Sequence, residues 1–219
     1  MKNMATEVKT NEYFYTESAK SGAGSRIISV LQVIAVVLVV FVLLYLVILL
    51  PNQVDGQSME PNFLDKEQLF TDKIINMVGT TGFGQAQGYD YGRGDVVVFP
   101  FGEISLIKRI VAIGGDTVRI EGGRVYLNGI LLDEEYIDPS QKPTAMPFSQ
   151  ATFPEGVDTV VPEGTYFVLG DNRPNSKDSR FADIGFLKRE QLSGRVFIRY
   201  WPPDRFGLIG RGKTNVSPD

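Results

Sequence analysis

The longest apolar run in the chain covers residues 27–50, reads IISVLQVIAVVLVVFVLLYLVILL and contains no charged residue. An α-helix of this length rises roughly 36 Å at about 1.5 Å per residue, enough to cross a hydrocarbon core of ~30 Å. A buried core helix is usually shorter and amphipathic. A cleavable secretory signal has a shorter apolar region followed by a small-residue cleavage site, whereas PNQVDGQ follows this run. We therefore predict a retained transmembrane helix.

Basic residues flank this run unequally. Four lysines or arginines precede it, within residues 2–26, and the first that follows is Lys66. Lysine and arginine are enriched in the cytoplasmic flanks of membrane spans. The sequence thus predicts a cytoplasmic tail over 1–26, a transmembrane helix over 27–50 and a large extracytoplasmic domain over 51–219.

Short β-branched and aromatic runs dominate the large domain, which is typical of β-strands. The clearest runs are residues 95–99, 105–113, 116–121, 124–128, 165–170 and 194–201. Gly122-Gly123 and Asn128-Gly129 stand between or after such runs as hairpin turn signals. These patterns predict antiparallel neighbours along the chain.

Two stretches interrupt the strand pattern. Residues 72–94 are rich in glycine and polar residues, and residues 138–158 contain four prolines. We interpret both as loops, the second as an excursion from the sheet. No alternation of strands and helices typical of parallel sheets is visible. The predicted fold is mostly β: an N-terminal transmembrane helix followed by an antiparallel β-sheet domain with a loop or hairpin excursion.

The composition narrows the possible chemistry. The chain has no histidine and no cysteine, which excludes a Ser-His-Asp triad, a thiol nucleophile, a disulfide framework and a zinc site of cysteines and histidines. A net charge of -4 argues against a dedicated nucleic-acid binder. Hydrolysis would need a hydroxyl nucleophile, and a neutral lysine is the obvious base.

Lys108 is the most informative candidate base. It lies within SLIKRIVAI, where alternation places Leu106, Lys108, Ile110 and Ala112 on one face and Arg109 on the other. Apolar neighbours desolvate the amine and lower its pKa, and a shift of about three from about 10.4 leaves a useful neutral fraction at roughly pH 7–8. The alternative is a lysine whose amine reaches water, as in most strands.

Two further segments carry hydroxyl groups. Ser58 lies in DGQSMEPNF shortly after the apolar run, so a nucleophile there would be close to the membrane surface; the alternative is a turn serine. GDNRPNSKDSR, residues 170–180, follows a predicted strand and offers Ser176 together with pairable carboxylates and arginines. An ordinary charged surface loop is its alternative interpretation.

In chain order, these segments resemble the bacterial type I signal peptidase family of membrane-anchored Ser-Lys endopeptidases. The resemblance rests on the apolar run followed by SMEP (58–61), RGDVVVF (93–99), KRIVAIGGD (108–116) and GDNRPNSKDSR (170–180), and it extends to RYWPPDRFGLI (199–209). The single span before the serine is similar to the one-anchor form common in Gram-positive bacteria. The chain has Gly114 where many members have proline, and Asn62 where threonine is common.

The resemblance implies specific roles. Ser58 would be the nucleophile, Lys108 the general base, and Ser176 the residue that hydrogen-bonds and orients the lysine amine. The Ser58 backbone N–H would donate to the oxyanion. Some members carry a helping serine where this chain has Gly56, so that side-chain donor is missing.

The resemblance also implies residues that support the site. Arg109 would pair with Asp171, and Asp178 with Arg180, as structural supports. Met59 would help to seat the domain in the lipid surface.

Substrate binding follows from the same resemblance. An extended substrate strand would lie beside residues 52–57 and 105–108. Val54, Val98 and Ile107 match wall positions of shallow apolar pockets that accept small residues before the cut.

The implied function is removal of N-terminal signal peptides from secreted precursors through an acyl-enzyme, with no metal or cofactor. The expected partners are signal-peptide-bearing precursors and the lipid bilayer, near the secretion translocon, and not nucleic acid. The expected location is the cytoplasmic membrane, with one span, a cytoplasmic N-terminus and the catalytic domain on the outer face.

Two other functions compete with this one. Self-cleaving Ser-Lys regulators of the bacterial damage response share the chemistry, but they are soluble, and the uncharged span opposes them. A membrane-tethered β-domain could serve as a scaffold or binding module. An inactive relative of that kind would be expected to lose Ser58 or Lys108, and both are present.

Overall fold

The computed structural model describes residues 23–216 of the chain. The predicted cytoplasmic tail over 1–26 lies outside the described residues except for 23–26, which begin the first helix. The chain divides into two compact units, Met1–Leu43 and Leu44–Asp219. We call the second the strand-rich unit.

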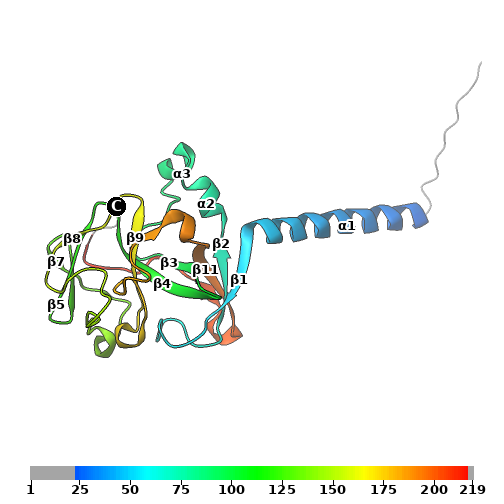
Figure 1. The fold of residues 1–219 in the computed structure, drawn as a ribbon. Helices are drawn as coiled ribbons and strands as arrows, with labels where there is room; N and C mark the ends of the chain where they lie inside the picture. Colours follow the sequence, from blue (N-terminus) through cyan, green and yellow to red (C-terminus); the bar gives the residue numbers. More distant parts are fainter. Residues whose placement is uncertain (1–22, 217–219) are drawn as a thin grey trace, which may run out of the picture. The chain divides into compact units, whose positions relative to one another are not determined.

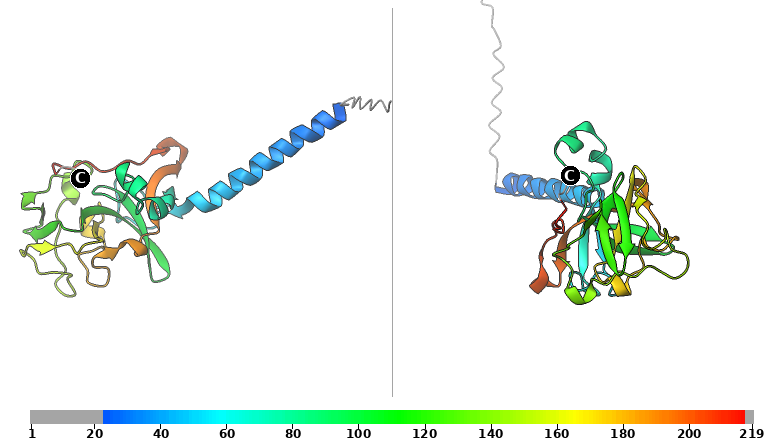
Figure 2. Two further views of the ribbon diagram at one scale, coloured as in Figure 1. Left: turned by 90° about the horizontal axis from the view of Figure 1, so that it is seen from above. Right: turned by 90° about the vertical axis from the view of Figure 1, so that its left-hand side faces the viewer.

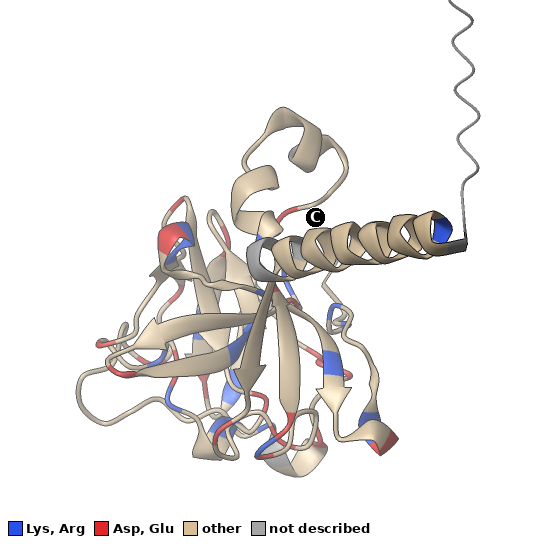
Figure 3. Cartoon of the chain, turned by 90° about the vertical axis from the view of Figure 1, so that its right-hand side faces the viewer, with Lys and Arg blue, Asp and Glu red and all other residues tan. Residues whose placement is uncertain are grey.

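The first helix, α1 (Ala23–Ile48), carries the predicted membrane span. Its segment Gly24–Leu43 has a mean hydropathy of 2.8 and is the one span candidate among the described residues. Arg26, in the first turn, is the one charged residue of this helix, and Figure 3 accordingly shows charge only near one of its ends. The helix ends two residues earlier than the predicted 27–50, because Leu49 and Leu50 already pair with a neighbouring strand.

The strand-rich unit is built from antiparallel strands with a few short helices (Figure 1). Its strands are β1 (Leu49–Gln53), β2 (Gln68–Asp72), β3 (Val96–Phe101), β4 (Ile104–Ile113), β5 (Thr117–Glu121), β6 (Arg124–Leu127), β7 (Ile130–Leu131), β8 (Thr159–Val160), β9 (Thr165–Leu169), β10 (Leu187–Lys188), β11 (Gly194–Trp201) and β12 (Gly207–Leu208). Its helices are α2 (Ile74–Val78) and α3 (Gly82–Ala86), with 3₁₀ turns η1 (Pro139–Gln141), η2 (Arg173–Asn175), η3 (Arg189–Gln191) and η4 (Pro203–Arg205). The mostly-β antiparallel fold predicted from the sequence is therefore confirmed.

The strands form two sheets. The larger has the order β1-β2-β11-β3-β4-β9-β10, with β12 against β11, and the smaller has the order β7-β6-β5-β8. In Figure 1 the smaller sheet lies at the end of the unit away from α2 and α3. The predicted hairpin turns are confirmed: Gly122 and Gly123, and likewise Asn128 and Gly129, all have positive φ angles, as type I′ turns require.

Strand β4 contributes to three apolar clusters. Ile107 packs in one, Ile110 in a second, and Val111 and Ala112 in a third. An irregularity in the β4–β9 pairing between Ile110 and Ala112 breaks the alternation, since a bulge turns the following side chains to the other face. The predicted placement of Ala112 on the face of Ile110 is therefore wrong.

The stretch 72–94 is not the plain loop that we predicted, because it contains α2 and α3. The buried side chain of Ile75 joins the core and so holds α2 in place. The hydroxyl of Thr81 accepts a hydrogen bond from Gly84 N at 3.0 Å and so caps α3. Figure 1 and the right panel of Figure 2 show the two helices projecting together from the body of the unit.

Candidate active site

Ser58 and Lys108 meet although fifty residues separate them in sequence. The Lys108 Nζ atom lies 2.8 Å from Ser58 Oγ and donates a second hydrogen bond, also 2.8 Å, to the carbonyl of Ile107. Strand β4 carries the lysine, and the connection between β1 and β2 carries the serine. At this distance a proton can pass directly between hydroxyl and amine.

Burial sets the protonation of Lys108. Its side chain is only 1% exposed, and this desolvation lowers its pKa from 10.5 to about 8. The carboxylates of Asp178 and Asp171 act in the opposite direction and keep the pKa from falling further. The predicted lowering of the lysine pKa by apolar surroundings is thus confirmed.

The backbone around Ser58 is held by residues on both sides. Val54 N donates to Glu67 O at 2.8 Å, which closes the base of the loop. Asn172 N donates to Ser58 O at 3.1 Å, and Asn172 Nδ2 donates to Gln57 O at 3.1 Å. Asn172 therefore couples the nucleophile loop to the GDNRPNSKDSR segment. We did not predict this role, since the sequence shows only an asparagine in a turn-rich loop.

One backbone donor remains beside the nucleophile. Among the residues that the structure describes, the Ser58 N–H has no hydrogen-bond partner. The Gly56 N–H is occupied, because it donates to Asp65 Oδ1 at 2.7 Å. The Ser58 N–H is therefore available as a donor beside the nucleophile, whereas Gly56 offers neither a side chain nor a free N–H.

Gly170 is a second residue whose role the sequence concealed. A Cβ at this position would lie 2.2 Å from Ser176 Oγ and 2.5 Å from Ser58 O. No other residue type fits there without moving one of the two serines. The absence of a side chain at Gly170 thus allows strand β9 to end against both hydroxyl-bearing segments.

Ser176 lies in the site but does not contact Lys108 as predicted. Its Oγ is buried and has no hydrogen-bond partner among the described residues. The amine of Lys108 instead donates to Ile107 O and Ser58 Oγ. The predicted Ser176–Lys108 hydrogen bond is absent from this structure, because these two acceptors take the hydrogen bonds of the amine.

Arg109 and Asp171 form the predicted ion pair. Arg109 Nε and Nη2 donate to the two carboxylate oxygens of Asp171 at 2.9 and 2.7 Å, and both side chains are buried. Asn62 Nδ2 donates to the same carboxylate at 2.8 Å and to Tyr136 O at 2.6 Å. The departure from the family pattern at Asn62 thus has a structural role: it ties the nucleophile loop to the ion pair.

The pair of Asp178 and Arg180 is also confirmed. Arg180 Nε and Nη2 donate to the two carboxylate oxygens of Asp178 at 2.8 and 2.9 Å. Arg180 Nη2 also donates to Ser176 O at 3.0 Å, and Gly170 N donates to Asp178 at 3.1 Å. This buried network positions the backbone on both sides of Ser176.

A third buried pair was not predicted. Arg173 pairs with Glu134, which follows the smaller sheet, and donates to Gly170 O at 3.0 Å and Thr144 Oγ1 at 3.0 Å. Only the tertiary fold brings residue 134 to this loop, so the sequence carries no local signal for it.

Met59 does not face lipid, because it is 1% exposed. It packs in one apolar cluster with Val54, Val98 and Ile107. The prediction for Met59 is therefore wrong, since burial in this cluster removes the side chain from any lipid contact. The three residues predicted to form substrate pockets do lie together next to the nucleophile loop.

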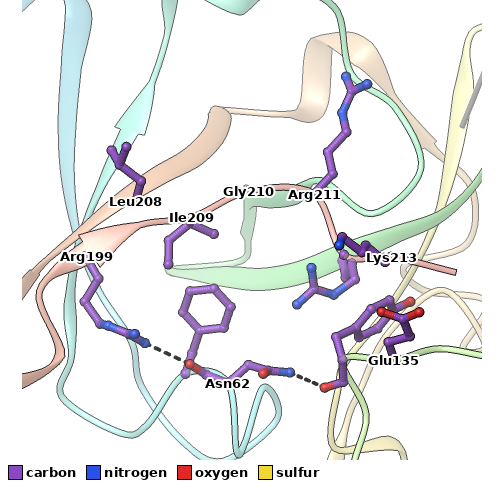
Figure 4. A pocket seen from close by; sticks show the side chains of 12 residues that line it. Asn62, Glu135, Arg199, Leu208, Ile209, Gly210, Arg211 and Lys213 are labelled. Carbon is purple, nitrogen blue, oxygen red and sulfur yellow. Dashed lines mark hydrogen bonds between the residues drawn. The ribbon is translucent and has the colours of Figure 1, made fainter.

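An open pocket of about 450 Å³ has Arg109 of this ion pair in its lining (Figure 4). Asn62, Arg109 and Tyr136 line it together with Arg199 and the segment 208–213. Neither Ser58 nor Lys108 lines it, so it is distinct from the dyad. No group of His, Cys, Asp or Glu side chains within residues 23–216 is arranged to hold a metal ion.

Comparison with known proteins identifies the family. A family model described as signal peptidase, peptidase S26, matches residues 27–201. The chain belongs to this family. It is therefore a peptidase, and the family together with the apolar helix α1 makes it a membrane-anchored protein.

Individual relatives agree with this family. A probable signal peptidase I-2 of Synechocystis sp. is 36% identical over 177 residues, which cover 75% of this chain and 71% of the relative. Signal peptidase I S of Bacillus subtilis (strain 168) is 33% identical over 156 residues, which cover 71% of this chain and 78% of the relative. A crystal structure of a signal peptidase I from Enterococcus faecalis V583 is 32% identical, covers 47% of this chain and 93% of that chain, and has a TM-score of 0.36.

Proposed function

We propose that this protein is a membrane-anchored serine endopeptidase that removes N-terminal signal peptides from secreted precursor proteins. The observation that carries the proposal is the 2.8 Å contact between Ser58 Oγ and the buried amine of Lys108. Family membership supplies the reaction class, and the contact supplies a nucleophile with its base.

The proposed reaction begins with neutral Lys108. Its amine accepts the proton of Ser58 as Oγ attacks the scissile carbonyl, and the Ser58 N–H stabilises the oxyanion. The intermediate collapses when the C–N bond breaks and the Lys108 ammonium gives its proton to the leaving amine. Lys108 then takes a proton from the water that attacks the acyl ester, the ester C–O bond breaks, and the Lys108 ammonium gives that proton to Ser58 Oγ, which restores the starting dyad. The chain's own residues suffice for every step.

Ser176 is proposed as a positioning residue that acts during turnover. A protonated amine has three N–H donors, and the structure uses two of them. The unpartnered hydroxyl of Ser176 is available as the third acceptor. The Ser176→Ala substitution is expected to lower kcat and to shift the acid limb of the pH profile of kcat. If Ser176 had only a structural role, the acid limb would keep its position.

Strand pairing leaves room for an extended substrate. Residues 104–108 of β4 pair with β3 on one edge, whereas the pairing with β9 begins at Arg109. No described strand covers the other edge of 104–108. We propose that the precursor adds a strand here, with Val54, Val98 and Ile107 forming walls that accept small side chains.

The finer topology is also a proposal. The basic residues before α1 favour a cytoplasmic N-terminus, with the strand-rich unit on the outer face of the cytoplasmic membrane. Ser58 follows the span closely, so cleavage would occur at that surface, where precursors leave the translocon. Protease accessibility in sealed vesicles tests this: digestion of residues 51–219 from the cytoplasmic side would contradict it.

The activity itself is tested with the full chain in lipid vesicles and a precursor that carries an Ala-x-Ala site. Wild type should release the mature protein, whereas Ser58→Ala and Lys108→Ala should lose at least about 10³-fold in rate. Ser140→Ala and Lys142→Ala, in the loop outside the site, are matched controls and should cleave normally. Wild-type rates in either site variant would overturn the assignment.

A further inference from the structure

The peptide unit between Gln57 and Ser58 carries the backbone donor beside the nucleophile. It consists of the Gln57 carbonyl and the Ser58 N–H, and it is trans. A trans peptide unit is planar, so its C=O and N–H point in opposite directions. A group that holds the Gln57 carbonyl in one direction therefore also aims the Ser58 N–H in the other.

Two hydrogen bonds hold this carbonyl. Glu60 N donates to Gln57 O at 3.2 Å, and Asn172 Nδ2 donates to the same oxygen at 3.1 Å. The Glu60 bond lies within the nucleophile loop and moves with it, so it cannot orient the peptide unit relative to Lys108. The Asn172 bond comes from 115 residues further along the chain. It therefore ties the direction of the peptide unit to the segment that follows β9.

The side chain of Asn172 is itself held in place. It is 4% exposed, and its Oδ1 accepts a hydrogen bond from Asn175 Nδ2 at 3.2 Å. A carbonyl oxygen only accepts hydrogen bonds, so the two contacts together determine which end of the amide faces Gln57. Asp171 and Arg173, the neighbours in sequence, both belong to buried ion pairs. The amide group thus has a defined position.

The direction of the Ser58 N–H matters because this loop offers no second donor at Gly56. The Gly56 N–H is bonded to Asp65 Oδ1 at 2.7 Å, and glycine has no side chain to contribute. The Ser58 N–H has no partner within residues 23–216. Because a hydrogen bond weakens steeply as its angle departs from linearity, a misaimed N–H would stabilise an oxyanion poorly.

We propose that Asn172 is a positioning residue, whose side-chain amide aims the Ser58 N–H at the oxyanion by holding the Gln57 carbonyl. The inference rests on the proposed function, because acyl transfer at Ser58 is the reaction that creates this oxyanion. Asn172 N also donates to Ser58 O at 3.1 Å. Asn172→Ala keeps this backbone bond and removes only the Nδ2 donor, so the loop stays attached while the peptide unit can rotate.

The first measurement is cleavage of the Ala-x-Ala precursor by the full chain in lipid vesicles. Asn172→Ala should lower kcat by about 10- to 100-fold and leave KM within about twofold, since the oxyanion exists only after the attack. Asn76→Ala is the matched control. It removes a hydrogen bond of the same kind, from Asn76 Nδ2 on α2 to Leu192 O at 2.9 Å, and should keep the wild-type kcat.

The deciding measurement compares two inhibitors with the same Ala-x-Ala peptide, one ending in an aldehyde and one in an alcohol. Ser58 Oγ bonds to the aldehyde carbon, the C=O π bond breaks and its electron pair moves to the oxygen, while the Oγ proton passes to Lys108. The alcohol binds without this reaction. Asn172→Ala should weaken the aldehyde at least about tenfold and the alcohol hardly at all. A merely structural role would weaken both inhibitors equally.

Asn172→Ser is the second variant, in case the alanine variant does not fold. Serine is uncharged and suits the start of the 3₁₀ turn η2, but its side chain is one atom shorter and does not reach Gln57 O. A wild-type ratio of aldehyde to alcohol affinity in either folded variant, from a wild-type protein that cleaves the precursor, would overturn this inference alone. Failure of the wild type to cleave would instead refute the proposed function and this inference with it.

Discussion

The amine of Lys108 lies 2.8 Å from the hydroxyl of Ser58, at a position where the lysine side chain is only 1% exposed. Contact and burial act together. The contact allows direct proton transfer, and burial supplies the neutral amine that accepts the proton.

The first prediction is an acid limb in the pH profile of activity. With the pKa of Lys108 lowered to about 8, the amine is mostly protonated below this pH and cannot act as a base. We expect kcat/KM for a peptide substrate to fall about tenfold per pH unit well below pH 8. The chain has no histidine to titrate instead. A flat profile from pH 6 to pH 9 would be incompatible with Lys108 as the base.

The second prediction concerns stability. The pKa of Lys108 is about 8 in the folded protein and near its ordinary 10.5 when unfolded, so the unfolded state binds more protons between these values and stability rises with pH across this window. Below pH 8 the folded protein carries the full penalty, about 3 kcal/mol at about 1.36 kcal/mol per pKa unit. Lys108→Met should therefore raise the free energy of unfolding at pH 7 by up to about 3 kcal/mol while it abolishes cleavage.

Thermal unfolding in detergent at several pH values measures this effect. The difference between Lys108→Met and wild type should shrink as the pH rises from 8 toward 10.5. A variant less stable than wild type at pH 7 would show that the hydrogen bonds of Lys108 outweigh its desolvation.

The third prediction tests the close approach at Gly170. The added methyl group of Gly170→Ala collides with Ser176 and with the Ser58 carbonyl, so the nucleophile should shift and kcat should fall by about 10². Gly207→Ala is the matched control, because nothing lies within 4 Å of a Cβ there. Steady-state kinetics of the two variants test this prediction. Equal kcat values for Gly170→Ala and Gly207→Ala would mean that the loop carrying Ser58 adapts to the added methyl group.

The fourth prediction concerns the buried ion pair. Asp171→Ala leaves the guanidinium of Arg109 buried and unpaired, which should destabilise the protein by about 3–5 kcal/mol. Asp183→Ala, which breaks the exposed pair with Lys177, should change the unfolding temperature far less. Comparable shifts of the unfolding temperature in the two variants would contradict the prediction that the buried pair stabilises the protein more than the exposed pair.

Local patterns predicted much of this protein. The apolar run, the six strand segments and the two hairpin turns depend on neighbouring residues, since periodicity and turn chemistry act over a few positions. The pairs Arg109–Asp171 and Asp178–Arg180 were predicted as well, both through the resemblance to a family. The lowered pKa of Lys108 followed from its apolar neighbours along the strand.

Other features arise only when distant segments meet. Nothing local distinguishes Met59 as a core residue, and the bulge after Ile110 depends on how β4 pairs with β9. Arg173 pairs with Glu134, 39 residues away in sequence. The amine of Lys108 does not bond Ser176 as predicted, because it donates to Ile107 O and Ser58 Oγ instead.

The sequence by itself determined an apolar helix, a β-rich domain and a chemistry restricted to hydroxyl and lysine, because these depend on composition and short-range pattern. The tertiary structure decided that Ser58 and Lys108 touch, that Gly170 must lack a side chain and that Arg173 pairs with Glu134. Each of these is a contact between segments far apart in the chain, and such contacts depend on how the strands pair and not on any residue's immediate neighbours.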